Sequence, residues 1–280
     1  MIAADIQESN FNKNLTNGYD LSILLGMDSF IYSISDESRQ VLALRAYSFE
    51  KAVSDFSRII TALQELLQQD KKLQLAYRKV RLGLVNKKST LVPNPFFDEN
   101  QKATYLDKVT RLSDSDLIKV DHLEPLAAKN VYLVNRDVIK LLRNQFPNLQ
   151  LYHSFSSLLL GLRQNTEHST GATLYGNVRE QVLQLVYFDG KDLVFSNSFG
   201  FHSSKDFIYF VMNVYHQFKL SPEEVPFVIS GQIVEDSEIY HLLYRYIRHL
   251  KIIELPAQFQ IGQELAREPQ HFYFDLFSLA

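Results

Sequence analysis

One pattern occurs twice in this chain and limits what the chain can fold into. The first copy reads LSILLGMDSFIYSISDESRQVLALRAYSF over residues 21–49, and the second reads LYGNVREQVLQLVYFDGKDLVFSNSF over residues 174–199. In each copy a glycine and a polar turn separate three apolar runs, which predicts a three-stranded antiparallel meander. The same number of residues separates Gly26 from Phe49 and Gly176 from Phe199. We therefore expect a duplicated fold in which these two pairs of residues correspond.

A helical pattern follows each predicted meander. From Phe49 to Leu67 apolar residues recur at steps of four and three, which predicts an amphipathic helix covering the first meander. In the second copy Ser203 is a predicted N-cap with Asp206 three residues later. The helix that follows has an apolar inner face made of Phe207, Phe210, Val211, Val214 and Phe218.

The remaining segments complete two domains, predicted at residues 1–165 and 166–280. Residues 71–129 break the pattern and are interpreted as an inserted subdomain of the first domain. Strands and helices then alternate, with strands at 130–134, 149–152, 227–229 and 252–253 and helices at 137–146, 154–162 and about 238–250, which predicts parallel strands beside each meander. Residues 1–18 are predicted to be a loosely held arm, and the apolar residues 272–279 are predicted to pack back onto the body.

Composition excludes several classes of protein. The 280 residues are 46% apolar, which is enough for two cores, and the net charge of −3 does not favour nucleic acid as the main partner. Cysteine is absent, which excludes disulfides and thiolate metal sites. The N-terminus lacks the apolar segment of a signal peptide, and no apolar run reaches the roughly 20 residues of a membrane helix. We therefore expect a cytoplasmic protein without a transmembrane segment.

The duplicated unit of meander, helix, strand, helix, strand and helix, with an insertion in the first copy, resembles the actin-like ATPase superfamily. The resemblance implies an α/β fold of two ribonuclease-H-like domains. Each domain would be a mixed sheet, a three-stranded antiparallel meander plus parallel strands, with helices on both faces. The chain looks similar to bacterial actin-like proteins of pilus and secretion platforms, and to an uncharacterised bacterial family described as actin-like in fold.

The resemblance also implies where a nucleotide would bind. In active members the first strand of each domain ends in Asp-x-Gly, where turn N–H groups approach phosphate oxygens and the carboxylate orients magnesium. This chain has Leu24 and Leu174 in place of the aspartates, and Gly26 and Gly176 in place of the glycines. A leucine side chain cannot bind a metal ion.

Two further positions belong to the same implied cleft. The adenosine-binding Gly-Gly turn of the family corresponds to Ser230 and Gly231, and Asp28 is the only carboxylate near the first turn. The degenerate nucleotide cleft would thus be formed by Leu24, Gly26, Asp28, Leu174, Gly176, Ser230 and Gly231.

Three functional hypotheses follow. The favoured one is a scaffold that has lost catalysis, uses no cofactor and binds another protein. The alternative is an active ATPase or sugar-kinase relative that binds ATP with magnesium through a rewired site at Asp28. The third is an interaction module unrelated to actin. Asp121, His122 and Glu124 have side chains of types that bind metals, but their sequence context favours a solvated loop, so we expect no metal.

The helix at 238–250 is the predicted partner surface. Opposite its apolar stripe, which includes Tyr246, the sequence places basic and aromatic residues that suit an acidic partner or a phosphate. A solvated polar face is the favoured interpretation of this pattern, and a partner or anion surface is the alternative. These residues are His241, Tyr244, Arg245, Arg248 and His249.

Overall fold

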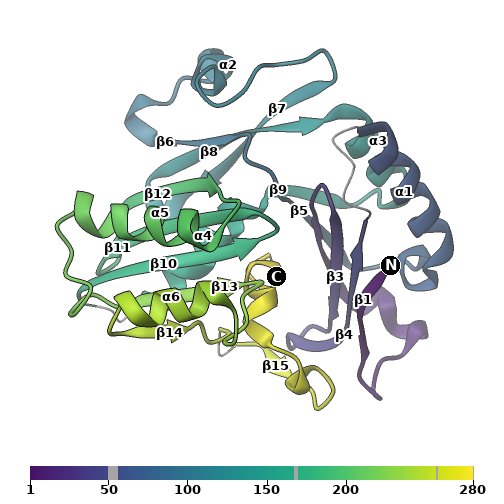
Figure 1. Cartoon of the computed structure of the whole chain (residues 1–280). Coiled ribbons are helices and arrows are strands. Elements are labelled where there is room, and N and C mark those ends of the chain that lie inside the picture. The colour runs from purple at the N-terminus through teal and green to yellow at the C-terminus, as the bar shows by residue number, and fades with distance from the viewer. Residues whose placement is uncertain (50–55, 167–169, 257, 280) are drawn as a thin grey trace. The chain divides into compact units, whose positions relative to one another are not determined.

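The computed structural model describes residues 1–49, 56–166, 170–256 and 258–279, and the chain divides into two compact units (Figure 1). The first unit comprises Met1–Leu158, Ala257–Glu268 and Leu276–Ala280, and the second comprises Leu159–Pro256 and Pro269–Asp275. Each unit has its own sheet, which contains one meander, and its own apolar core. The predicted α/β class and the mixed sheets are confirmed.

The first unit is built on a seven-stranded sheet in the order β1-β4-β3-β2-β5-β9, with β15 also pairing β4. The predicted first meander is present as three antiparallel strands, and two strands parallel to β2 extend it. The strands are β1 (Ile2–Gln7), β2 (Asp20–Leu25), β3 (Ser29–Ser35), β4 (Gln40–Ser48), β5 (Lys79–Leu84), β9 (Leu149–His153) and β15 (Gln260–Ile261).

The N-terminal segment is not a loosely held arm. Strand β1 pairs antiparallel with β4, and residues Lys13–Gly18 form the 3-10 helix η1, capped by Asn12. The prediction was wrong because the pairing partner of β1 lies about forty residues further along the chain, and the polar composition of the segment gives no sign of it.

Helices α1 (Phe56–Gln69) and α3 (Arg136–Gln145) pack side by side against one face of this sheet (Figure 1). Leu63 and Leu67 of the predicted apolar stripe are buried in that core. The predicted start of the stripe at residues 50–55 lies outside the described residues. The 3-10 helix η2 (Lys71–Gln74) follows α1, and α4 (Ser154–Asn165) follows β9.

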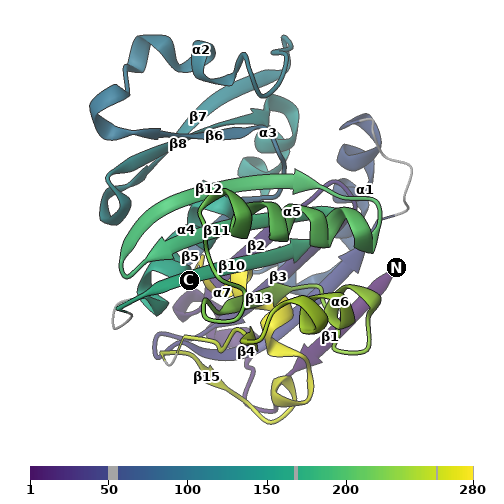
Figure 2. The same ribbon diagram turned by 60° about the vertical axis from the view of Figure 1, so that its left-hand side comes forward.

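A separate three-stranded sheet, in the order β6-β8-β7, forms the insertion (Figure 2). Its elements are β6 (Ser89–Pro93), η3 (Asn94–Phe96), η4 (Glu99–Gln101), α2 (Lys102–Leu106), β7 (Asp116–Leu123), η5 (Glu124–Leu126) and β8 (Ala128–Asn135). Two strands are exchanged relative to the prediction. The strand near Leu82, expected within the insertion, is β5 of the large sheet, and the strand at 130–134, expected in the large sheet, is β8 of the small one. A short apolar run does not show which strand it will pair with.

The second unit is built on a five-stranded sheet in the order β12-β11-β10-β13-β14, with β13 and β14 parallel to β10. Ser203 and Asp206 form the predicted capping box at the start of α5. Helix α6 ends at Tyr246, so the predicted extension of this helix to Leu250 is wrong, because Leu250 begins β14. The elements are β10 (Ala172–Arg179), β11 (Val182–Asp189), β12 (Asp192–Gly200), α5 (Ser204–Gln217), β13 (Phe227–Gly231), α6 (Glu238–Tyr246) and β14 (Leu250–Ile252).

The chain ends in short helical segments, η6 (Leu265–Arg267), η7 (Gln270–Tyr273) and α7 (Phe274–Phe277). Phe274, Leu276, Phe277 and Leu279 are buried, which confirms that the apolar tail packs back onto the body. Within the part of the chain that the structure describes, no helix combines the length and apolar character needed to cross a membrane.

Candidate functional site

Leu24 lies one residue before the carboxyl end of β2 and is 1% exposed. A Cβ atom built on Gly83 of the neighbouring strand β5 would lie 2.8 Å from Leu24 Cδ2 and 3.0 Å from Leu279 Cδ1. Both leucine side chains therefore lie against the backbone of Gly83. The position that the resemblance assigns to a magnesium-binding carboxylate is therefore part of an apolar contact with Leu279.

Gly26 and Asp28 lie in the turn between β2 and β3. The Gly26 N–H donates to the Ser29 carbonyl at 2.9 Å, and the Phe49 N–H donates to the Asp28 carbonyl at 2.6 Å. The turn N–H of Gly26 is thus used to close the turn itself. Asp28 is half-buried, so it is the carboxylate of this turn that solvent reaches.

The second copy does not match the first in register. The turn that corresponds to Gly26 follows Arg179, the last paired residue of β10, whereas Gly176 lies inside that strand and pairs with Leu185. A Cβ on Gly176 would lie 2.6 Å from Phe227 Cζ, so this glycine makes room for a core ring. Leu174 is fully buried in the same core. The predicted equivalence of Gly26 and Gly176 is therefore wrong, although the strands that contain or precede them correspond.

Arg179 occupies the strand end beside the true second turn. Its Nε and Nη2 atoms donate to the two carboxylate oxygens of Asp275, each at 2.6 Å, and Nη2 also donates to the Phe272 carbonyl at 2.8 Å. The two charged side chains are 3% and 2% exposed. Burial lowers the pKa of Arg179, but Asp275 outweighs it and holds that pKa above its ordinary value. The sequence did not indicate this buried ion pair.

The end of β13 lies beside the turn that follows Arg179. Gly231 has a φ of +83°, and a Cβ there would lie 2.0 Å from the Val178 carbonyl oxygen, so only glycine fits. The Ser230 hydroxyl donates to Asn177 Oδ1 at 2.8 Å. The backbone N–H of Glu180, in the turn, donates to Gln232 Oε1 at 2.9 Å. This turn N–H is bound by the chain's own side chain.

The predicted partner surface is divided between a helix and a loop. His241, Tyr244 and Arg245 are exposed on α6, with Tyr244 73% exposed. Arg248 and His249 are also exposed but lie beyond the end of the helix, where Arg248 Nη1 is 3.4 Å from a Glu223 carboxylate oxygen. An exposed pair of this kind contributes little to stability, so Arg248 is available to a partner.

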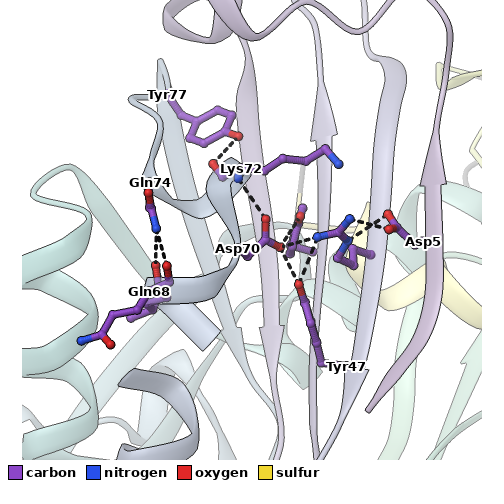
Figure 3. A network of polar contacts seen from close by, with 10 residues as sticks. Asp5, Tyr47, Gln68, Asp70, Lys72, Gln74 and Tyr77 are labelled. Atoms are coloured by element: carbon purple, nitrogen blue, oxygen red, sulfur yellow. Dashed lines mark hydrogen bonds and ion pairs between the residues drawn. The ribbon is translucent and has the colours of Figure 1, made fainter. Parts of the chain in front are cut away.

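Two buried polar clusters were not predicted. In the first, Asp70 accepts hydrogen bonds from the hydroxyls of Tyr32 and Tyr47, each at 2.7 Å, and lies 3.2 Å from Arg45 Nη1 (Figure 3). Burial alone would raise the pKa of Asp70, but the hydrogen bonds from Tyr47 and Tyr32 hold it below its ordinary value. Arg45 in turn binds both carboxylate oxygens of Asp5 on the edge strand. This cluster ties η2 to three strands of the sheet.

A polar cavity of about 470 Å³ lies beside this cluster. Its lining includes Arg45 with Asp5 and Arg267 with Glu264, and each of these pairs is joined by an ion pair. Because most of its charges already have partners within the chain, we assign it no ligand.

In the second cluster Asp121 of β7 is buried and accepts hydrogen bonds from the Tyr132 hydroxyl at 2.9 Å and the backbone N–H of His153 at 2.8 Å. His153 Nδ1 accepts from the Phe155 N–H at 3.2 Å, which assigns the ring proton to Nε2. Burial raises the pKa of Asp121 and lowers that of His153 to about 4. These groups join the inserted sheet to the end of β9.

The segment considered for metal binding is not a solvated loop throughout. Asp121 is buried in a strand, whereas His122 and Glu124 are exposed and 3.8 Å apart. Over the described residues, no three acidic or histidine side chains are grouped so as to hold a metal ion.

The two meanders with their parallel strands have the fold of actin-like ATPases. The chain is similar to a Bacteroides thetaiotaomicron protein described as having an actin-like ATPase fold and unknown function, with 18% identity and a TM-score of 0.78 over 87% of this chain and 93% of that one. It is also similar to a chain of the PilM-PilN type IV pilus biogenesis complex, with 13% identity and a TM-score of 0.64 over 93% and 97%.

The particular family is given by the sequence itself. Residues 8–250 match the family described as protein of unknown function (DUF3822), and the chain belongs to that family. No curated protein sequence matches it.

Proposed function

We propose that this protein is a non-catalytic actin-like scaffold that works in the cytoplasm by binding another protein. The observation that carries the proposal is the position of the C-terminal segment. Within the first unit Leu279 lies beside Leu24 at the end of β2, and within the second Asp275 is paired with Arg179 at the second turn. Residues of the chain thus lie at the two strand ends that correspond to the phosphate-binding turns of active actin-like ATPases.

These residues do not fit magnesium nucleotide. Leu24 and Leu279 offer no oxygen ligand, and the guanidinium of Arg179 is already bound to a carboxylate. The turn N–H of Glu180 is occupied by Gln232. Phosphoryl transfer depends on electrostatic stabilisation by metal and donors at these places, so its loss favours a role without catalysis.

Binding of a partner is supported by the exposed side chains of α6. Tyr244 and Arg245 combine aromatic area with positive charge, and tyrosine and arginine are enriched at protein interfaces. The pilus relative is described as part of a complex of two proteins, so this fold occurs in a protein assembly.

The test is the melting temperature of the full chain with and without magnesium and ATP, together with ATP turnover. A ligand at 100 times its dissociation constant would add about 2.7 kcal/mol and raise the melting temperature by several degrees. We expect no shift and no turnover, with an active actin-like ATPase as the positive control. Magnesium-dependent turnover that is lost in Asp28→Ala would replace the proposal with an active ATPase.

A further inference from the structure

Helix α5 has apolar side chains on part of its outward face as well as on its buried face. Phe207 and Val211 are buried against the sheet. An outward stripe is formed by Ile208 and Met212, which are half-buried, and Tyr209, which is 65% exposed. A surface helix of a globular protein normally has a polar outer face, so this apolar stripe is a candidate contact surface.

The outward stripe of α5 forms one wall of a shallow apolar hollow of about 310 Å³. Tyr246, which is 49% exposed, forms the other wall. Tyr246 is the last residue of α6 and lines the hollow with residues of α5, so the C-terminal end of α6 lies beside the N-terminal part of α5. Both views show the two helices side by side on one face of the five-stranded sheet (Figures 1 and 2). The sequence placed Tyr246 on the buried stripe. The residues of the α5–α6 hollow are Lys205, Ile208, Tyr209, Met212, Asn213 and Tyr246.

The helices that form the α5–α6 hollow carry two exposed basic residues near it. Lys205 lines the hollow, and Arg245, which is not part of the lining, directly precedes Tyr246 on α6. Among the described residues neither has a carboxylate within ion-pair distance. Asp206 is committed to the helix cap, where its carboxylate accepts the N–H groups of residues 202 and 203. The acidic residues of α6 and its approach, Glu235, Asp236 and Glu238, lie at the opposite end of that helix.

We propose that the α5–α6 hollow binds an acidic amphipathic helix of a partner protein, an inference that rests on the proposed protein-binding function. Apolar side chains spaced at i, i+3, i+4 and i+7 along such a helix would fill the hollow, as in other helix-in-groove complexes. Its flanking carboxylates would pair with Lys205 and Arg245. Tyrosine and methionine suit this role, because they combine contact area with adaptable shape.

The probe is a fluorescein-labelled synthetic helix of roughly 18 residues, or five turns, with leucine and phenylalanine on one face and glutamate on the other. Two peptides serve as controls, one with lysine in place of glutamate and one with the same composition in scrambled order. Fluorescence anisotropy with the full chain should show that the acidic amphipathic peptide binds at least about tenfold more tightly than either control. Added salt should weaken this binding.

Variants locate the binding surface. Tyr209→Ser and Arg245→Glu should each reduce affinity for the acidic peptide about tenfold, as expected for anchor residues. Two matched changes on β12 and the turn before it, Val194→Ser and Lys191→Glu, also alter an exposed apolar and an exposed basic side chain and should leave affinity unchanged.

Binding of the acidic peptide no tighter than that of the controls would overturn the inference, and so would unchanged affinity in both Tyr209→Ser and Arg245→Glu. A dimer in sedimentation velocity that Tyr209→Ser abolishes would assign the surface to a second copy of the chain and would also overturn it. The nucleotide measurements are independent of these peptides. ATP turnover would therefore refute the non-catalytic scaffold without changing the peptide result.

Discussion

Removal of the Asp275 carboxylate should destabilise the protein strongly. In the native structure this carboxylate is bound by two donors of Arg179, and both side chains are almost fully buried. Asp275→Ala would leave a buried guanidinium with no opposite charge, bound only to the Phe272 carbonyl. Breaking a buried pair in this way costs about 3–5 kcal/mol of unfolding free energy.

A double-mutant cycle separates the pair from its packing. Arg179→Met combined with Asp275→Leu removes both charges while keeping most of the apolar volume, and such replacements of buried pairs are often close to neutral. We therefore expect the double variant to be more stable than Asp275→Ala alone. The cycle is completed by the single variants Arg179→Met and Asp275→Leu. The double variant should lose less unfolding free energy than the sum of the two single losses, by well over the about 0.5 kcal/mol expected of independent sites.

The assay is urea denaturation followed by circular dichroism, because urea does not screen charge as guanidinium does. The slope of the unfolding free energy against urea should be similar in all variants if the folded state is retained. A loss below about 1 kcal/mol in Asp275→Ala would mean that the pair is hydrated, as surface pairs are. The turn after β10 would then be open to a ligand, which would contradict the proposal that the Arg179–Asp275 pair fills it.

Four other variants test the same structure. Leu24→Asp and Leu174→Asp should each lower stability by a few kcal/mol, since each buries an unpaired carboxylate, and unchanged thermal melting would mean that both places are wet. Gly231→Ala should also lower the melting temperature, because φ is +83° and the new Cβ would meet a backbone oxygen at 2.0 Å; an unchanged value would contradict that geometry. Burial lowers the pKa of His153 from 6.5 to about 4 on folding. The neutral ring therefore contributes about 3 kcal/mol to the unfolding free energy above pH 6.5, and this stability is lost as the pH falls towards 4. Asp121 has a raised pKa, so its effect on the unfolding free energy changes with pH in the opposite direction. Urea denaturation of wild type and His153→Asn separates the two effects, and the variant should lose less stability between pH 6.5 and 4. Equal losses would refute the assignment to His153.

The sequence predicted the elements whose causes are local. The meanders follow from alternating apolar runs and polar turns, and the start of α5 follows from the reciprocal hydrogen bonds between Ser203 and Asp206. The apolar tail follows from its composition. In each case the residues that decide the structure lie within a few positions of one another.

The errors and omissions concern contacts between distant segments. Strand β1 was missed because its partner is β4, and β5 and β8 were exchanged because sheet membership depends on pairing. The largest error concerns the candidate site. The repeated Leu-x-Gly predicted that Gly176 lies in a turn as Gly26 does, whereas Gly176 lies inside a strand and makes room for the ring of Phe227. Arg179 and Asp275 are far apart in sequence, and neither belongs to a motif.

The central claim is that the chain's own residues occupy the positions where active relatives bind nucleotide. Isothermal titration calorimetry of the full chain with magnesium and ATP tests this claim most directly. We predict no saturable heat at concentrations that saturate an active actin-like ATPase run in parallel. A saturable isotherm with about one site, abolished by Asp28→Ala, would contradict the account.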